Sequence, residues 1–288
     1  MPPYNGPAMP ELPEVETIRR GIAPHVVGRT IQRVVVRDRR LRWPIARGFE
    51  RKLQGRRIVA VDRRGKYLLL DLDGSPTAEP GGRDRVILHL GMTGNLALQQ
   101  PGQPVRKHDH VDFELSGDRV LRFNDPRRFG AALWWPGSHA THFLLEHMGP
   151  EPFADEFNAD YLFALSRRRS APVKNFLMDG RVVVGVGNIY AVEALFRAGI
   201  RPMRAAGRVT RAEYAKLVAA TREVLEAAIA AGGTTFRDFL DSNGEPGYFV
   251  QKLFVYDRAG QPCRRCKTPI RRLVIGQRSS FYCPRCQK

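Results

Sequence analysis

The sequence has no apolar run of the roughly 18 residues that a membrane-spanning helix needs. It also lacks a basic N-terminal patch followed by an apolar stretch, so we expect no secretory signal and a cytoplasmic protein. Internal repeats and long low-complexity tracts are absent too. The 288 residues are enough for two domains of ordinary size, each with a well-buried core.

Acidic residues are scarce relative to basic ones. Lys and Arg number 47 against 29 Asp and Glu, which gives a net charge of +18 and an isoelectric point near 10.5. Arginine supplies most of this charge, and its guanidinium suits bidentate contact with phosphate. Such a field attracts polyanions, so we expect a nucleic-acid partner. A generic contribution of the charge to solubility is the alternative.

Cysteine is confined to the C-terminal end of the chain. Two C-x-x-C pairs, sixteen residues apart, contain all four cysteines: Cys263, Cys266, Cys283 and Cys286. This spacing can place four thiolates tetrahedrally around one zinc ion. Disulfides are disfavoured without secretion, and a redox pair would need only one C-x-x-C in a βαβ setting. We therefore predict one structural zinc ion in a small basic finger.

The first half of the sequence predicts many short strands after one helix. A helix is predicted over 11–23, where acids in the first turn favour a helix start. Strands are predicted at 30–36, 58–62, 66–71, 85–90, 111–115, 120–123 and 131–135. Gly- and Pro-rich loops separate them, a spacing typical of an antiparallel sandwich or barrel.

Helical patterns dominate after about residue 136. We predict helices at 139–147, 159–169, 189–198 and 210–231, and strand-like runs from residue 247. The expected fold class is α+β, with four segments: an N-terminal extension, a β domain, a helical domain and a zinc finger, over residues 1–8, 10–136, 137–246 and 247–288.

A glycine-rich segment in the second half is nearly a dinucleotide-binding fingerprint. Residues 182–191 look like a strand leading into G-x-G-x-x-x-A, one residue longer than the fingerprint, and a helix. No alternating βαβ pattern surrounds the segment. We favour a glycine turn whose backbone N–H groups, with Asn188, bind a phosphate at a helix start.

Residues 9–19, MPELPEVETIR, resemble the opening of the formamidopyrimidine-DNA glycosylases, the bacterial enzymes that repair 8-oxoguanine. Other segments are similar to that family's signatures, in the same order along the chain: RGKY at 64–67, HLGMTG at 89–94, KHDHVD at 107–112, DPRRFG at 125–130, GVGNIY at 185–190 and QR at 277–278. The resemblance implies an N-terminal β-sandwich and a helical domain with a helix–two-turn–helix motif and a zinc-finger β hairpin. It also implies excision of oxidised purines from duplex DNA, followed by strand cleavage.

The resemblance implies a catalytic role for four residues. Pro10 matches the nucleophile, and an α-amino group has a pKa near 8, so part of it is unprotonated at neutral pH. Its secondary amine would form an iminium with the sugar that allows β- and δ-elimination. Glu11 matches the general acid/base, while Lys66 and Arg278 match proton donors or phosphate contacts in the eliminations. From the residues alone, Glu11 is a helix-start acid and Lys66 a solvated charge.

Further residues are similar to the family's positions that bind DNA. Met92, Arg127 and Phe129 match the trio that fills the gap left by an everted base, a role that apolar wedges can serve. Core packing is the alternative for Met92 and Phe129, although flanking glycines favour turn tips. Other predicted contacts or positioning residues are Glu14, His108, Arg168, Asn188 and Tyr190. Residues 234–248 resemble the segment that covers the everted base.

One feature departs from the family pattern. The family's proline is the first residue of the mature chain, whereas eight residues precede Met9 here. An attached extension would make the Pro10 nitrogen an amide without a nucleophilic lone pair. We expect a misassigned start, with the functional chain beginning at Pro10, over a clipped extension or an inactive copy.

Two rival hypotheses remain open. One is an endonuclease VIII-like glycosylase that prefers oxidised pyrimidines, which the Leu12-Pro13 pair and the complete gap-filling trio disfavour. The other is a zinc-finger DNA-binding protein without enzymatic activity. Either way the expected partner is duplex DNA, damaged if the chain is an enzyme. Nothing in the sequence asks for a protein partner, so we expect a monomer.

Overall fold

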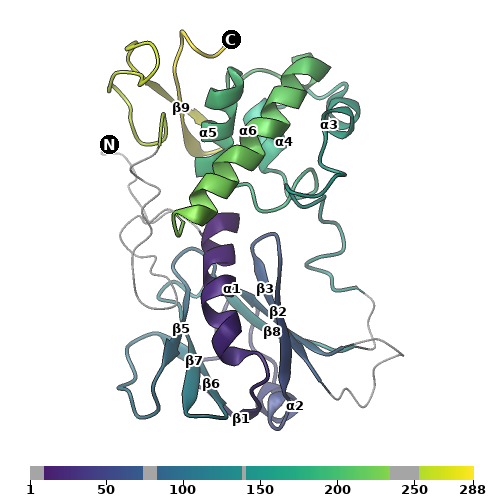
Figure 1. Cartoon of the computed structure of the whole chain (residues 1–288), viewed down its shortest axis with the longest axis vertical. Coiled ribbons are helices and arrows are strands. Elements are labelled where there is room, and N and C mark those ends of the chain that lie inside the picture. Colours follow the sequence, from purple (N-terminus) through teal and green to yellow (C-terminus); the bar gives the residue numbers. More distant parts are fainter. Residues whose placement is uncertain (1–9, 74–82, 138–140, 234–252) are drawn as a thin grey trace. The chain divides into compact units, whose positions relative to one another are not determined.

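The structure, a computed structural model, describes residues 10–73, 83–137, 141–233 and 253–288. These residues form two compact units. The first holds the described chain up to Glu146 together with residues 231–233, and the second holds His147–Ala230 and residues 253–288. Figure 1 shows a β-rich first unit and a mainly helical second unit. No helix within the described ranges is both long and apolar enough to cross a membrane.

Helix α1 spans Leu12–Val26 and provides one side of the first unit's core. The buried residues Val15, Ile18 and Ile22 recur every three or four positions, which places them on one face of the helix. The helix predicted at 11–23 is therefore confirmed, and it continues for three residues more.

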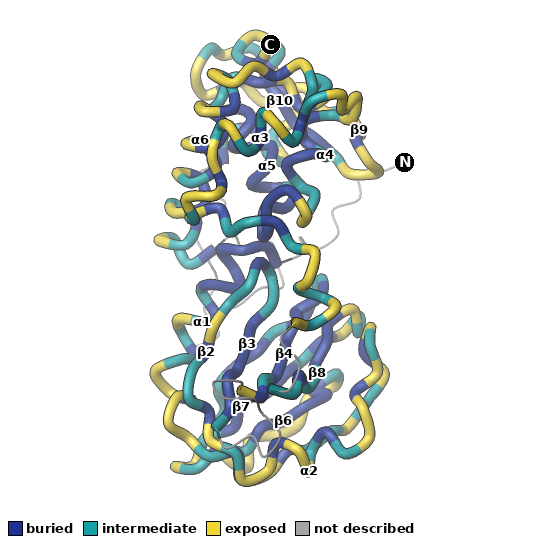
Figure 2. Tube along the Cα trace, turned by 90° about the vertical axis from the view of Figure 1, so that its right-hand side faces the viewer, coloured by how far each residue is buried: buried dark blue, intermediate teal, exposed yellow. Residues whose placement is uncertain are grey.

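Two antiparallel four-stranded sheets complete the first unit. One sheet has the order β1-β6-β7-β5 and the other has the order β2-β3-β4-β8. The strands are β1 Ile31–Val36, β2 Ile58–Arg64, β3 Tyr67–Leu72, β4 Arg85–His89, β5 Asn95–Gln99, β6 Asp109–Leu115, β7 Arg119–Asn124 and β8 Ala131–Trp135. Apolar side chains of both sheets join α1 and the short helix α2, Phe49–Leu53, in one core, and Figure 2 shows β3 and β4 buried along most of their length. The predicted β-sandwich is confirmed.

The second unit contains the remaining helices. They are α3 Ala159–Ser166, α4 Val173–Met178, α5 Asn188–Ala198, the 3₁₀ helix η1 Ala206–Arg208 and α6 Arg211–Ala230. Helix α5 is buried almost all round and packs against α6. The helices predicted at 159–169, 189–198 and 210–231 are confirmed with small changes at their ends. The helix predicted at 139–147 is wrong, because residues 141–147 form turns and 138–140 lie outside the described residues.

The C-terminal finger is a β hairpin bordered by the two cysteine pairs. Strand β9, Arg271–Ile275, pairs with β10, Arg278–Tyr282, across the two-residue turn at 276–277. Ile270 and Phe281 pack with Val192 and Phe196 of α5 in a small cluster that also contains Cys263 and Cys283. The finger therefore shares its apolar core with the helical unit.

Candidate active site and DNA-binding residues

The start of helix α1 holds the predicted nucleophile and two buried acids. Pro10 is buried and directly precedes Glu11, which is the N-cap residue of the helix. The backbone N–H of Glu11 donates a 2.8 Å hydrogen bond to the carboxylate of Glu14, and the two residues form a reciprocal capping box. Glu14 therefore fixes the backbone beside Pro10. Glu11 and Glu14 can therefore cap the helix and still have a role in the chemistry at Pro10.

Lys66 lies in the tight turn between β2 and β3. Arg64 pairs with Tyr67 across the two strands, so the turn consists of Gly65 and Lys66 alone. Gly65 has a φ of 57°, which side-chain-bearing residues rarely adopt, and this lets the hairpin close in two residues. Such a turn holds the half-buried Lys66 at the tip of two paired strands.

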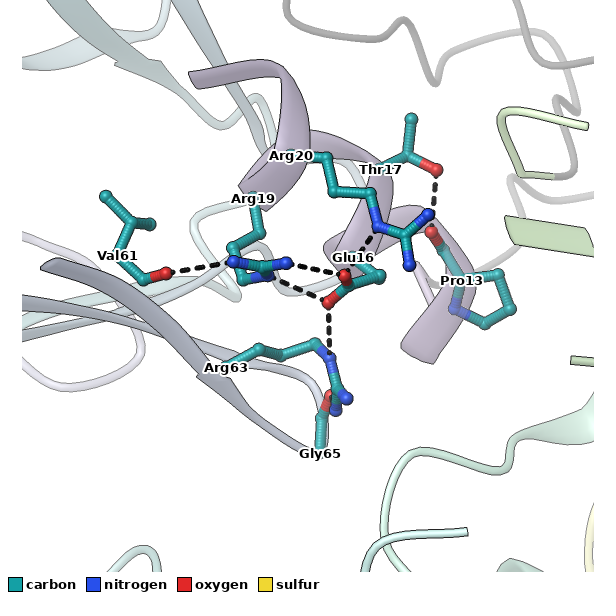
Figure 3. A network of polar contacts seen from close by, with 8 residues as sticks. All are labelled: Pro13, Glu16, Thr17, Arg19, Arg20, Val61, Arg63 and Gly65. Carbon is teal, nitrogen blue, oxygen red and sulfur yellow. Dashed lines mark hydrogen bonds and ion pairs between the residues drawn. The ribbon is translucent and has the colours of Figure 1, made fainter. Parts of the chain in front are cut away.

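Glu16 links helix α1 to that hairpin (Figure 3). Its buried carboxylate accepts hydrogen bonds from Arg19 and Arg20 of α1, at 2.8–3.0 Å, and from Arg63 of β2 at 3.1 Å. Arg63 also donates a 3.0 Å bond to the carbonyl of Gly65. Burial opposes ionisation of Glu16, but the three guanidinium groups outweigh it and lower the pKa of Glu16 to about 2.

The sequence alone gives Glu16 no functional role, although the arginines three and four residues later are a pattern that favours ion pairs on a helix. The contact with Arg63 could not be foreseen, because 47 residues separate the two positions.

His89 is a second residue to which the sequence assigns no role, although it is the first residue of the HLGMTG motif. It ends strand β4 and is buried, and its ring lies against that of Tyr67, tilted by 37°, with the ring centroids 4.7 Å apart. Burial, followed by the positive charges of Lys66 and Arg42, lowers the pKa of His89 to about 4. The ring is therefore neutral at physiological pH, and its Nδ1 accepts a 3.1 Å bond from the N–H of Gly91.

The structure brings the three predicted gap-filling residues onto two adjoining loops. Met92 is half-buried in the loop between β4 and β5, and the side chain of Phe129, between β7 and β8, is 43% exposed. The guanidinium of Arg127 lies 4.8 Å from the centre of the Phe129 ring. Core packing is therefore excluded for Phe129.

The other predicted DNA contacts lie in both units. His108, in the first unit, is half-buried with its ring 6.2 Å from that of His110. Arg168, in the second, is exposed just after α3. Both have a positive φ, of 75° and 62°, which is uncommon for residues other than glycine.

Asn188 and Arg278 belong to the second unit, near the join between helix α5 and the finger. Asn188 is the first residue of α5, and its side-chain amide donates a 3.0 Å bond to the carbonyl of Ser279. Its Oδ1 is buried and has no hydrogen-bond partner among the described residues. Arg278 is exposed at the start of β10, next to Ser279. The segment before Asn188 consists of turns, so the strand suggested at 182–184 is absent.

The prediction that Tyr190 contacts DNA is wrong for its side chain. Tyr190 is 0% exposed and is among the largest fully buried residues of the chain. Two positions separate it from Asn188, and on a helix this turns the two side chains toward different faces. The motif therefore combines one residue at the helix start with one core residue.

The four cysteines form the predicted metal site. Their sulfur atoms all lie within 4.8 Å of one another, with 3.9 Å between Cys263 and Cys286 and 3.4 Å between Cys266 and Cys283. Tetrahedral zinc with bonds of about 2.3 Å needs sulfurs about 3.8 Å apart. Burial and the neighbouring thiols raise the pKa of Cys286 to about 12, whereas hydrogen bonds from Thr268 lower the pKa of Cys266 to about 6. Four thiolates this close repel one another, so a cation is needed to hold them together.

Two predicted features lie outside the described residues. They are the N-terminal extension at residues 1–8 and the covering segment at 234–248.

Comparison with protein families places three domain types along the chain. Residues 9–132 match the formamidopyrimidine-DNA glycosylase N-terminal domain, residues 148–240 match the H2TH domain of the same enzymes, and residues 260–288 match the zinc finger found in FPG and IleRS. With the sandwich, the helical unit and the four-cysteine site, they define a zinc-finger DNA glycosylase with a helix–two-turn–helix domain. The zinc ion is structural, because four thiolates leave no open position.

Individual relatives narrow the class to one family. The formamidopyrimidine-DNA glycosylase of Pseudomonas putida (strain F1) is 58% identical over 280 residues, which cover 97% of this chain and 100% of the relative. The crystal structure of the MutM (Fpg) protein from Thermus thermophilus is 40% identical, with a TM-score of 0.83 over 96% of this chain and 98% of that one. A complex of Lactococcus lactis Fpg with DNA containing an abasic site is 31% identical, with a TM-score of 0.86 over 96% and 99%. The chain belongs to the formamidopyrimidine-DNA glycosylase family and is a glycosylase and abasic-site lyase of base excision repair.

Proposed function

We propose that the chain excises oxidised purines, 8-oxoguanine and formamidopyrimidines, from duplex DNA through a covalent bond between Pro10 and the damaged nucleotide. The observation that carries the proposal is the arrangement of Pro10, Glu11 and Glu14 at the start of α1, within a chain that resembles these glycosylases over its whole length. A Lactococcus lactis relative has been crystallised with DNA containing N7-benzyl-Fapy-dG, at 31% identity and a TM-score of 0.86 over 97% of this chain and 100% of that one.

The chemistry follows from a secondary amine. The Pro10 nitrogen attacks C1′ of the deoxyribose, the bond to the damaged base breaks, and the amine loses its proton. Glu11 supplies and accepts protons in these steps. Glu11 then protonates O4′ as the C1′–O4′ bond breaks and the sugar ring opens. The product of ring opening is an iminium, which is positively charged without any further proton and withdraws electrons from C2′. Loss of the C2′ proton then expels the 3′ phosphate, and a second elimination expels the 5′ phosphate, with Lys66 and Arg278 as proton donors or phosphate contacts.

This mechanism requires a free amine at residue 10. In the 288-residue sequence the Pro10 nitrogen is an amide, so the active species is a chain that begins at Pro10. The match to the N-terminal family domain supports this proposal, because it begins at residue 9.

The proposed partner is damaged duplex DNA, bound by a monomer in the bacterial cytoplasm. The everted base leaves a gap that Met92, Arg127 and Phe129 fill, and their place on two adjoining loops supports this role. His108, Arg168 and Asn188 are proposed phosphate contacts.

Borohydride trapping on a duplex with 8-oxoguanine opposite cytosine tests the proposal. We expect a chain starting at Pro10 to become covalently attached to the DNA. Pro10→Gly lacks the secondary amine, so much less of it should be trapped. Glu11→Gln should lower the excision rate about 10²- to 10⁴-fold, the range for a general acid/base. Glu226→Gln, an exposed acid on α6, is the matched control and should retain full activity.

Intact-mass measurement of the trapped species checks the N-terminus, which should be Pro10. A trapped chain that still carries residues 2–9, or a processed chain that binds the duplex without being trapped, contradicts the mechanism. Comparing release of 8-oxoguanine with release of thymine glycol separates this proposal from a preference for oxidised pyrimidines.

A further inference from the structure

Asp125 connects the two loops that carry Met92, Arg127 and Phe129. It is 0% exposed and follows the last residue of β7. One carboxylate oxygen accepts a 3.0 Å hydrogen bond from the hydroxyl of Thr93, and the other accepts a 2.8 Å bond from the backbone N–H of Gly130. The donors come from different loops, so one buried carboxylate holds both.

The hydroxyl of Thr93 completes the connection. It donates to Asp125 and lies 3.3 Å from the backbone N–H of Arg127, which points at both the hydroxyl and the carboxylate. Thr93 is adjacent to Met92, and Gly130 is adjacent to Phe129. Each of the three gap-filling residues is thus fixed through its own backbone or through that of its neighbour.

The surroundings leave Asp125 little freedom. Its backbone N–H donates a 3.0 Å bond to the carbonyl of His108, and its carbonyl lies 2.8 Å from Nε2 of His110. The two loops also touch directly, because a Cβ built on Gly91 would lie 2.5 Å from the carbonyl carbon of Phe129. The two loops therefore form one packed structure in the protein without DNA.

We propose that Asp125 and Thr93 form a lock that sets Met92, Arg127 and Phe129 as one rigid wedge before DNA is bound. The proposal rests on the gap-filling role proposed above. Inserting side chains between stacked bases is costly, and a wedge that is already ordered loses less conformational freedom when it enters. Asp125 is too deeply buried to touch DNA, so it and Thr93 are positioning residues.

Two variants of Thr93 separate the hydroxyl from the shape of the side chain. Thr93→Val removes the hydroxyl and keeps the volume, whereas Thr93→Ser keeps the hydroxyl. We expect Thr93→Val and Asp125→Asn each to lower kcat/KM for excision of 8-oxoguanine from duplex DNA by about tenfold or more, since each disturbs a hydrogen bond to a charged group. Thr93→Ser should stay close to the wild-type value.

A second substrate distinguishes positioning from general damage to the fold. A single-stranded oligonucleotide with an abasic site has no stack to fill, so borohydride trapping on it should be unchanged in all three variants. Three outcomes would overturn the lock. Thr93→Val and Asp125→Asn could lose as much activity on the single strand as on the duplex, or lose none on the duplex. Thr93→Ser could also be as impaired on the duplex as Thr93→Val. If Asp125→Asn does not fold, the Thr93 pair decides alone. A wild-type chain that is not trapped on the 8-oxoguanine duplex contradicts the proposed function, and the lock with it.

Discussion

At the start of helix α1, the same two acids serve the fold and lie next to the proposed nucleophile. Glu14 accepts the backbone N–H of Glu11, and both side chains are 3% exposed. A helix start leaves backbone N–H groups without partners inside the helix, and the capping box satisfies two of them. Replacing Glu14 would therefore move the backbone beside Pro10 as well as remove a charge.

Glu16 allows a test of how helix α1 is held to the Lys66 hairpin. Glu16→Gln keeps the shape but removes the charge that three arginines share. We expect the free energy of unfolding at neutral pH to fall by about 2 kcal/mol, the size of hydrogen bonds to a charged group. Urea denaturation measures the change. Glu114→Gln is the control: its ion pair with Arg33 is exposed and 3.8 Å long, so it should cost at most about 0.5 kcal/mol.

The same residue predicts a dependence on pH. The pKa of Glu16 is about 2 in the fold and 4.5 in the unfolded chain. Because the folded value is the lower one, the contribution is complete above about pH 4.5 and is lost as the pH falls toward 2. The difference between wild type and Glu16→Gln should therefore narrow between pH 7 and about pH 3. A difference that stays constant over this range would show that the carboxylate charge is not what stabilises the link.

At the scale of elements, the sequence predicted those that carry a strong local pattern. Seven strands and the two long helices have alternating or helical apolar periodicity, and they were found. The structure adds β5, α2 and α4, each only five or six residues long, where one or two apolar positions define no period. The same contrast holds for the residues of the site. The roles of the cysteines and Pro10 can be predicted from sequence motifs. Those of Glu16, His89 and Asp125 cannot, because they depend on contacts between distant segments.

The two loops of the lock meet at Gly91, which makes this glycine a test of their packing. It has a φ of 64°, and an added Cβ would meet the backbone of Phe129 and Gly130 at 2.5–2.6 Å. We expect Gly91→Ala to lower the free energy of unfolding by about 2–5 kcal/mol, from the left-handed backbone plus overpacking.

Gly102→Ala, in the loop between β5 and β6, is the matched control for Gly91→Ala. Gly102 has a φ of 79° but no atom within 4 Å of the built Cβ, so it should lose only the backbone part, about 1–2 kcal/mol. Urea denaturation of the two variants measures the difference. Equal losses would mean that the loops can separate without cost.

At the scale of the whole molecule, we expect the positive charge and the metal to serve the same contact, the one proposed between the finger and DNA. The chain carries a net charge of +18, and the finger hairpin exposes Arg271, Arg272 and Arg278. Its apolar cluster is small and shared with α5, so the four zinc–sulfur bonds hold much of the hairpin's shape. Removing the metal should therefore leave the net positive charge of the chain in place while changing where the arginines point.

The salt dependence of DNA binding tests whether DNA is attracted by the net charge alone or also by arginines that the zinc site holds in place. Removing one ion pair between an arginine and a phosphate should reduce the slope of log K against log salt by about 0.9, because fewer counterions are released. We expect Arg272→Ala to reduce the slope by one such step. Arg57→Ala, which removes the same charge beside Asp73 at the end of β2 opposite Lys66, should leave it unchanged. Chelation of zinc should reduce the slope at least as much as Arg272→Ala, although the side chains are intact. Equal slopes for all four samples, measured by fluorescence anisotropy, would mean that net charge alone attracts DNA and that the finger makes no specific contact.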